Sequence, residues 1–468
     1  MRRGRAAAIA FLVLAPLGVF TRGPLQESAR PLSARAAPAG AGGLHLVSRV
    51  IGATGVLRAI VLDGLWLRTL RLQRRGEHFE AALLAKAIAR LEPRIDAAWT
   101  FQARHLAYDI TPSFPPEERW PWVLESIEIL RGEALPLNPD SIPIHLELAF
   151  IHHHKIGLDL DDAAPLYRSR LATLFEGKEG RDLAARHMDT GLLARLGAEM
   201  GAALDPRAAG SHALYWARHG LEAGNPGADP AGAAALERID ALSRIQLYHT
   251  GRPVRALLGG FFAFVPDLRF AGAADRAVKQ ALGMEGVDPA EAAETLQTEG
   301  ARRILYLVIS GRLEDARREH ATRPGAPAFE SVVFETAFGS LPASREGALE
   351  ALASATEASV LVEVAGEEDL ARGFGDLAEI AAARATAIGK ATPTAREARS
   401  AVESRLRARW SARPAWQPLA ARLPPAAGSP PELPDPDRLL FRLDLLDPAL
   451  HPDPSPGARR ASPGDARP

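Results

Sequence analysis

The chain has 468 residues, 47% of them hydrophobic, which is enough apolar material for about two to four domains or one extended repeat array. Lys and Arg total 56 against 57 Asp and Glu, so the net charge is −1. This balance lacks the basic excess on which bulk nucleic-acid binding depends, and we expect no nucleic-acid partner. The absence of cysteine excludes disulfides, cysteine-bearing zinc sites and thiol nucleophiles.

Residues 1–23 are predicted to be a signal peptide or a signal anchor. Arginines precede an apolar run, residues 6–20, which would span roughly 22 Å as a helix against a hydrocarbon core of about 30 Å. Its shortness favours a cleaved signal, but the small-residue cleavage sites at 34–36 and 37–39 lie well past it, which favours an uncleaved tether. Both alternatives predict export. The body would be anchored in the inner membrane facing the periplasm, or periplasmic or secreted after cleavage. Arginines that follow the run leave a cytosolic protein as the remaining alternative.

Residues 24–43 are rich in Ala, Pro, Gly and Arg and are predicted to be a linker. From residue 44 to 412 the pattern is helical almost throughout, with no run that alternates like a strand, which predicts an all-α body of helical hairpins. The most regular pattern, up to residue 175, predicts six helices. The first ends at Gly76, the second covers 78–92, and the third ends near Asp109. The fourth runs from Trp120 to about Gly132, the fifth covers 143–157, and the sixth runs from about 162 to 175.

A repeat register supports the hairpins. The spacing of Gly76, Ala81 and Pro93 is that of an inter-helix turn, a close helix contact and a helix end. In the next hairpin, Trp99 is at the position of the aromatic that fills the groove between hairpins, and Ala103 is at the position of a small residue. This spacing is typical of the 34-residue tetratricopeptide repeat, which stacks into an α-solenoid.

The segments LWLRTLRLQRRGEHFEAALLAKAIARLEP, AWTFQARHLAYDI and HHHKIGLDLDDAAPLY resemble a family of uncharacterised tetratricopeptide-type proteins from planctomycetes and deltaproteobacteria. The likeness covers residues 65–170 well and extends more loosely to about 325, with a weaker echo of the turn at Gly311 and Ala316. It implies a helical repeat region over 44–325 and carries no catalytic activity that could be transferred.

Two further segments follow. Residues 326–412 keep helical patterning and are predicted to be an additional helical segment. Residues 413–468 are Pro-rich and predicted to be disordered. Within them, residues 437–447 (DRLLFRLDLLD) are amphipathic, and form either a docking peptide for a partner groove or an element that packs back on the body.

The strongest candidate for a metal or catalytic site is His152–His154, with His145 two helical turns earlier and Glu147 nearby. Histidines and carboxylates bind zinc, so a metal-dependent hydrolase on a helical scaffold is one alternative. It requires the side chains to converge, whereas three consecutive histidines on a helix point in three directions. No HExxH motif is present. We therefore assign no catalytic, cofactor-binding or metal residue, and no cofactor.

Two smaller sets have a structural and a functional reading. Asp161 and Asp162 are predicted to cap a helix, with cation binding as the alternative. Trp120 and Trp122 are predicted to be inter-repeat aromatics, with stacking on a ligand such as a sugar as the alternative.

The sequence as a whole favours a non-catalytic scaffold or adaptor of the cell envelope that binds another protein or peptide on the concave surface of stacked hairpins. Arg104, His105 and His145 are candidate positions for that groove, but they are not assigned as a site because the sequence does not show which face is used. A purely structural envelope protein, whose Pro-rich tail contacts other surface components, is the further alternative.

Overall fold

A computed structural model describes residues 55–177, 182–183, 186–257, 260–283, 288–389, 392–425, 431–436 and 438–447. The predicted signal or anchor (1–23), the predicted linker (24–43) and the last part of the predicted tail (448–468) lie outside these ranges. The chain divides into two compact units, Met1–Ile60 and Val61–Pro468. Of the first unit, only the opening turns of one helix, from residue 55 to 60, are described.

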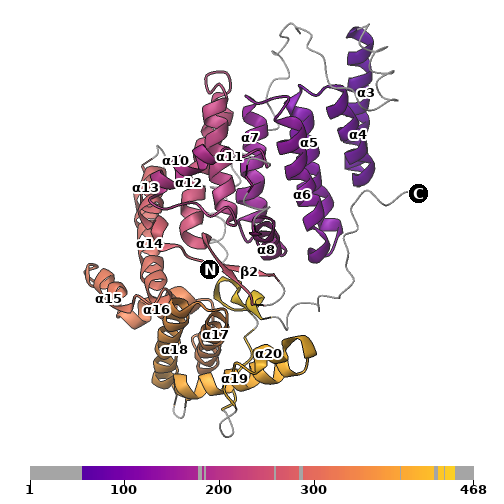
Figure 1. The fold of residues 1–468 in the computed structure, drawn as a ribbon. Helices are drawn as coiled ribbons and strands as arrows, with labels where there is room; N and C mark the ends of the chain where they lie inside the picture. Colours follow the sequence, from indigo (N-terminus) through magenta and orange to yellow (C-terminus); the bar gives the residue numbers. More distant parts are fainter. Residues whose placement is uncertain are drawn as a thin grey trace. The chain divides into compact units, whose positions relative to one another are not determined.

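The described residues are mostly helical, as the sequence predicted (Figure 1). We find no helix in these ranges that is both long enough and apolar enough to cross a membrane.

The helices up to residue 175 follow the predicted boundaries closely. They are α3 (Gly55–Arg74), α4 (His78–Leu91), α5 (Asp96–Arg104), α6 (Trp120–Glu128), α7 (Ile142–Phe150) and α8 (Ala164–Leu174). Helix α5 contacts α4, α6 and α7. Three of the helices continue as π-helical segments, namely η2 (His105–Ile110) after α5, η5 (Ile129–Ala134) after α6 and η6 (Ile151–Ile156) after α7. Two short 3₁₀ turns, η3 (Thr111–Ser113) and η4 (Pro116–Glu118), lead into α6.

The residues of the predicted repeat register take the local roles expected of them. Gly76 has φ +76° in the turn between α3 and α4, a conformation that favours glycine, and Ala81 is fully buried. Trp99 is 2% exposed, and its indole Nε1 donates to the Pro93 carbonyl at 2.9 Å. Gly311, at φ +70°, forms a similar turn further along. These observations confirm the local geometry, whereas membership of a repeat family stays a prediction.

Two glycines of this hairpin are expected to respond oppositely to alanine. A Cβ at Gly76 or at Gly64 would meet nothing within 4 Å, so only backbone conformation differs. Gly76→Ala should lower the free energy of unfolding by about 1–2 kcal/mol because its φ is positive. Gly64→Ala, inside α3, should raise it by about 0.5–1 kcal/mol. Urea unfolding of both variants measures the pair, and a loss at Gly64 equal to that at Gly76 would contradict the assignment.

The central helices are α10 (Thr190–Met200), α11 (Ala209–Ala223), α12 (Pro230–Thr250) and α13 (Ala271–Leu282), with the 3₁₀ turn η7 (Leu268–Phe270) before α13. Helices α7, α11 and α12 each contact the other two. At the crossing of α11 and α7, a Cβ on Gly220 would lie 2.5 Å from the Cβ of His145, so only glycine permits this approach. Trp216 and Tyr215 fill the core beside it.

A two-stranded antiparallel sheet interrupts the helical chain and was not predicted. Strands β1 (Arg252–Arg255) and β2 (Phe262–Val265) pair with Arg252 opposite Val265 and Arg255 opposite Phe262. All four residues of β2 are buried, so the strand shows no alternation of polar and apolar residues. A short apolar run of this kind cannot be separated from a buried helix turn by its pattern, which is why the sequence analysis missed it.

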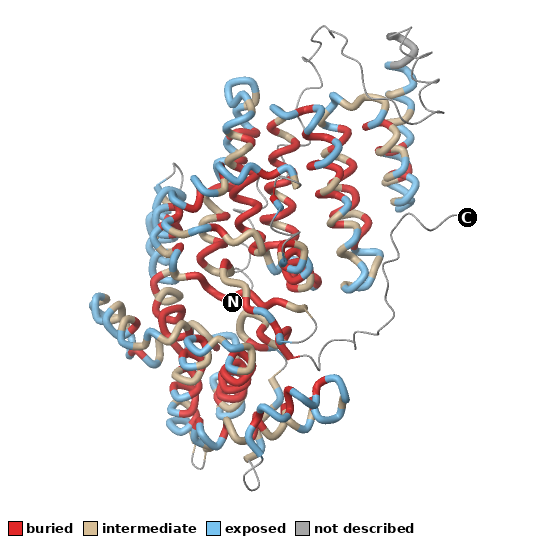
Figure 2. Tube along the Cα trace, in the orientation of Figure 1, coloured by how far each residue is buried: buried red, intermediate tan, exposed pale blue. Residues whose placement is uncertain are grey.

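The C-terminal helices are α14 (Pro289–Ile309), α15 (Leu313–Ala321), α16 (Phe329–Phe338), α17 (Arg345–Val364), α18 (Glu368–Ile388) and α19 (Ala395–Ser411). Helix α17 contacts α18 and α19, and Figure 2 shows it buried over most of its length. Many of its buried residues are alanines, which lets the neighbouring helices approach closely. Helix α14 contacts α15, α16 and α18, so helices on both sides of the boundary predicted at residue 325 pack together.

Part of the tail predicted to be disordered is folded against the body. After α19 come the 3₁₀ turn η8 (Pro414–Trp416), the short helix α20 (Gln417–Ala420) and the 3₁₀ segment η9 (Leu440–Leu446), which contacts α17 and β2. Leu443 is fully buried. The prediction of disorder is therefore wrong for residues 413–425 and 438–447. Of the two readings of residues 437–447, packing on the body is what the described residues 438–447 show.

Asp447 fastens this segment to α19. Its carboxylate is fully buried and accepts hydrogen bonds from Trp410 Nε1 and Arg409 Nη1, both at 2.7 Å. Asp447→Ala leaves a buried indole N–H and a guanidinium without this acceptor and should cost about 2–4 kcal/mol of unfolding free energy. Asp435→Ala is the matched control, because Asp435 pairs with the same arginine but is 63% exposed, and should cost below about 1 kcal/mol. Chemical denaturation decides, and equal losses in the two variants would contradict the role of Asp447.

Candidate functional site

The three π-helical segments continue α5, α6 and α7, and α5 contacts both of the other helices. They contain His105 and His152–His154 of the candidate residues. Segment η2 contacts α4 and α6, while η5 contacts α5 and α7. Single π-helical turns are rare and often occur at functional sites. This region is therefore a candidate functional site.

Glu147 and Arg104 form a charged pair across α7 and α5. Glu147 is 3% exposed and accepts from Arg104 Nε at 3.2 Å and Nη2 at 2.5 Å, a two-pronged contact that suits a guanidinium. Burial raises the pKa of Glu147, although the adjacent guanidinium opposes that shift. The arginine also lies over the Phe150 ring, 5.8 Å from its centroid. The Glu147 carboxylate and the Arg104 guanidinium are thus paired with each other.

A second charged pair joins η6 to the segment before α8. The Lys155 ammonium, on a residue that is 6% exposed, donates to Asp161 Oδ2 at 2.5 Å and to Thr111 Oγ1 at 3.0 Å. It lies between the rings of Tyr108 and Tyr167, 5.2 and 5.6 Å from their centroids. The lysine is therefore held by an anion, a hydroxyl and two aromatic faces.

Asp161 is the centre of this cluster. It also accepts from Arg119 Nη1 at 2.9 Å and from the backbone N–H of Ala163 at 2.9 Å. Burial opposes its ionisation, but the hydrogen bonds from Lys155 and Ala163 lower the pKa of Asp161 to about 2. Asp162 contacts the same arginine at the surface, at 2.5 Å. The helix-capping role predicted for this pair is wrong: the N-cap residue of α8 is Ala163, no side chain among the described residues caps the helix, and the backbone N–H from which Asp161 accepts is that of Ala163 itself.

The four histidines of the predicted metal constellation point away from one another. His145 Nε2 lies 2.8 Å from His219 Nδ1 on α11, and His152 stacks on His212 with ring centroids 5.0 Å apart. His153 Nδ1 lies 3.1 Å from Gln246 Oε1 on α12. His154 lies next to Tyr108, with Nδ1 3.5 Å from the phenol oxygen. The convergence that a metal-dependent hydrolase requires is not found at these residues.

Burial keeps these imidazoles neutral. It lowers the pKa of His145, His153 and His212 to about 4 each, and it lowers the pKa of His152 well below its ordinary value. A neutral imidazole could ligate a metal, but no three His, Asp or Glu side chains within the described ranges are grouped so as to hold one.

Two of the three candidate positions for a binding groove are buried. His105 is 1% exposed, with Nδ1 2.7 Å from Asp109 Oδ2 and Nε2 2.8 Å from the His78 carbonyl oxygen. His145 is fully buried, as described above. Only Arg104 reaches solvent, with 42% of its side chain exposed. The two histidines do not line a groove because both are buried, and Nε2 of each bonds a residue on another helix.

The predicted tryptophan pair separates into two environments. Trp120 lies near Tyr167, with ring centroids 6.3 Å apart. Trp122 stacks on Phe114 at 5.5 Å and meets the edge of Phe79 at 5.8 Å, so aromatic residues of α4 and α6 gather at one surface. Both tryptophans are partly buried. We call Phe79, Leu83, Phe114 and Trp122 the aromatic patch, a surface that was not predicted from the sequence.

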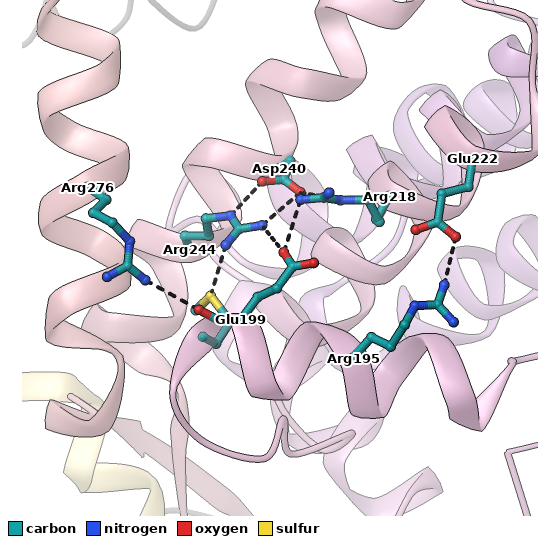
Figure 3. Close-up of polar contacts among 8 residues, drawn as sticks. Arg195, Glu199, Arg218, Glu222, Asp240, Arg244 and Arg276 are labelled. Carbon is teal, nitrogen blue, oxygen red and sulfur yellow. Dashed lines mark hydrogen bonds and ion pairs between the residues drawn. The ribbon is translucent and has the colours of Figure 1, made fainter.

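An arginine–carboxylate network joins α10, α11 and α12 (Figure 3). Arg244 and Arg218 both donate to Asp240, at 2.6 and 3.1 Å at the shortest, and both approach Glu199 at 3.4 Å. Arg195 and Glu222 form a separate pair at 2.8 Å, and Arg276 donates to the backbone carbonyl of Glu199. Because each carboxylate has guanidinium partners from another helix, the network fastens helices together.

A cavity of about 200 Å³ opens between α12, α13 and α14. Arg303 on its wall pairs with Asp275 at 2.8 Å and with Glu319 at 3.7 Å, and Arg323 pairs with Glu319 at 3.3 Å. The charged groups at this cavity are thus largely neutralised by one another, and no catalytic arrangement follows from them.

No protein-family model, curated protein or solved structure matches this chain. A functional conclusion therefore depends on the geometry described above.

Proposed function

We propose that this protein is a non-catalytic scaffold of the cell envelope that binds another protein or a peptide through the surface of its paired helices. The single observation that carries the proposal is the aromatic patch. Phe79 is 51% exposed and Leu83 is 69% exposed, although both belong to a helix whose other face is buried in the core.

The composition of the patch is that of a binding hot spot. Phe79 and Leu83 are four residues apart, so they lie on one face of α4. Phe114 and Trp122 extend that face, with the rings of Phe79 and Phe114 6.0 Å apart and nearly perpendicular. Aromatic anchors of this kind dominate the energetics of protein interfaces because they bury a large area with little loss of conformational entropy.

Charged residues follow the patch by about one helical turn, Lys86 three residues after Leu83 and Glu125 three residues after Trp122. Lys86 and Glu125 approach to 3.8 Å, one on α4 and the other on α6, and both side chains are about a third to a half exposed. An apolar centre with a charged rim is the usual anatomy of a transient protein interface. The polar cluster around Lys155 and Asp161 supports the proposal indirectly, since its charged groups are paired with one another inside the protein.

The proposal is tested by incorporating a photo-crosslinking amino acid at Leu83 of the full chain in its native cells. Leu296, on α14 and 47% exposed, is the matched control position. We expect a discrete protein or peptide adduct at position 83, none of that mass at 296, and loss of the adduct when Phe79→Glu is added. The absence of an adduct at 83, equal adducts at both positions, or an adduct that persists in Phe79→Glu would overturn the proposal.

A further inference from the structure

Helix α3 exposes a second surface, distinct from the aromatic patch. One of its faces packs inward: Thr69 is fully buried, Leu72 is 6% exposed, and the Trp66 ring meets the edge of Phe101 at 5.3 Å. Gln73 Nε2 also donates to Asp109 Oδ2 at 2.8 Å. The exposed residues that we call the outer face are Val61, Leu67, Arg68, Arg71 and Arg74 of α3, together with Arg75 in the turn that follows it.

The outer face changes character along the helix. Its first half presents Val61, 40% exposed, and Leu67, 55% exposed. Its second half presents the four arginines. Since a helix rises about 1.5 Å per residue, the transition from apolar to basic takes place within roughly 20 Å.

The charge of this face is strongly biased. Between residues 61 and 76 there are four arginines and one acidic residue, Asp63, whereas the whole chain has a net charge of −1. Basic charge is thus concentrated beside exposed aliphatic side chains. A nucleic acid would match the arginines but not the apolar half.

We propose that the outer face of α3 binds the surface of a membrane that contains anionic phospholipids. Such a surface offers hydrocarbon directly below a layer of phosphates, in the same order as the two halves of this face. Guanidinium groups bind phosphate oxygens in pairs, and the aliphatic stems of arginine pack along apolar material while the charge stays in the headgroup layer. The contact is peripheral and does not depend on the signal or anchor predicted at residues 1–23.

The chain contains no cysteine, so a single cysteine can be labelled uniquely. We would introduce Leu67→Cys in the full chain, attach an environment-sensitive fluorophore, and titrate with vesicles of phosphatidylcholine alone or mixed with phosphatidylglycerol. The proposal expects a blue shift at position 67 with the anionic vesicles only, reversed by high salt. A label at Leu296→Cys should not respond.

Two matched triple variants show whether the response depends on the arginines of the outer face or on the net charge of the protein. Arg71→Gln/Arg74→Gln/Arg75→Gln should weaken the response at position 67 by roughly fivefold per arginine. Arg238→Gln/Arg317→Gln/Arg372→Gln removes the same charge from exposed sites elsewhere and should leave the response nearly unchanged. No shift at position 67, an equal shift with uncharged vesicles, or an equal loss in the two triple variants would overturn the proposal. A shift caused instead by self-association, detected by sedimentation without vesicles, would do the same.

Discussion

Asp161→Ala is expected to lower the free energy of unfolding by about 3–5 kcal/mol, because it removes one partner of a buried ion pair. Among the described residues, the Lys155 ammonium would then keep the Thr111 hydroxyl at 3.0 Å and the two tyrosine faces, in a position where its side chain is 7% exposed. Arg119 would lose one of its two carboxylate partners as well. Urea denaturation followed by far-UV circular dichroism measures the loss.

Two further variants show whether the uncompensated charge is the cause. Asp162→Ala removes the neighbouring carboxylate, which contacts Arg119 but is 62% exposed, and should cost below about 1 kcal/mol. Adding Lys155→Met to Asp161→Ala should recover much of the stability, since the stranded ammonium is replaced by an apolar chain of similar length. If the double variant is no more stable than Asp161→Ala, the unpaired Lys155 ammonium is not the cause of the lost stability.

The second large effect expected is loss of stability in mild acid. Burial lowers the pKa of His145, His153 and His212 to about 4, against an ordinary value of 6.5. Between these two values the unfolded chain binds more protons than the folded protein, so stability falls as the pH falls from 6.5 towards 4 and is fully present above 6.5. One such histidine accounts for a loss of about 2 kcal/mol at pH 5.

The carboxylates modify this profile only at lower pH. The pKa of Asp161, lowered to about 2, adds a further loss below its ordinary value of 3.8. The raised pKa of Glu147 acts in the opposite direction near pH 4.5, because the folded protein then binds the proton more readily. Since a typical domain has only 5–15 kcal/mol of stability, several buried histidines should suffice for cooperative unfolding between about pH 5 and 4.

The measurement is the midpoint of urea unfolding from pH 7.5 to 4.5, from which the protons taken up on unfolding follow. His153→Gln keeps a hydrogen-bonding side chain beside Gln246 but cannot be protonated, and should reduce the proton uptake by about one. His320→Gln is the control, because this ring is only partly buried and bonds just the Pro327 carbonyl among the described residues. An unchanged profile in His153→Gln would contradict the assignment.

The helix boundaries were predictable because their signals are local. Gly76 ends one hairpin helix through its positive φ, and Pro93 follows the end of α4 because it cannot continue the helix. The buried Ala81 and Trp99 follow from the same spacing. The function and the family stay predictions, since neither follows from these turns.

The candidate surfaces could not be predicted in the same way. The aromatic patch unites Phe79 of α4, Phe114 of the loop between η3 and η4, and Trp122 of α6, which have no common spacing in the chain. The strand β2 was missed because burial on all sides leaves no alternating pattern.

By itself the sequence determined the helical class, the turns between successive helices and the charge balance, because each depends on residue type and on neighbours within a few positions. Only the tertiary structure decided what the polar residues do. His145 meets His219 across 74 positions, and the carboxylate of Asp447 reaches Trp410 across 37. Such partners are chosen by helix packing, which joins His145 to His219 on another helix and places the Asp447 carboxylate against Trp410 and Arg409. The same residue types at the surface would remain hydrated and make neither contact.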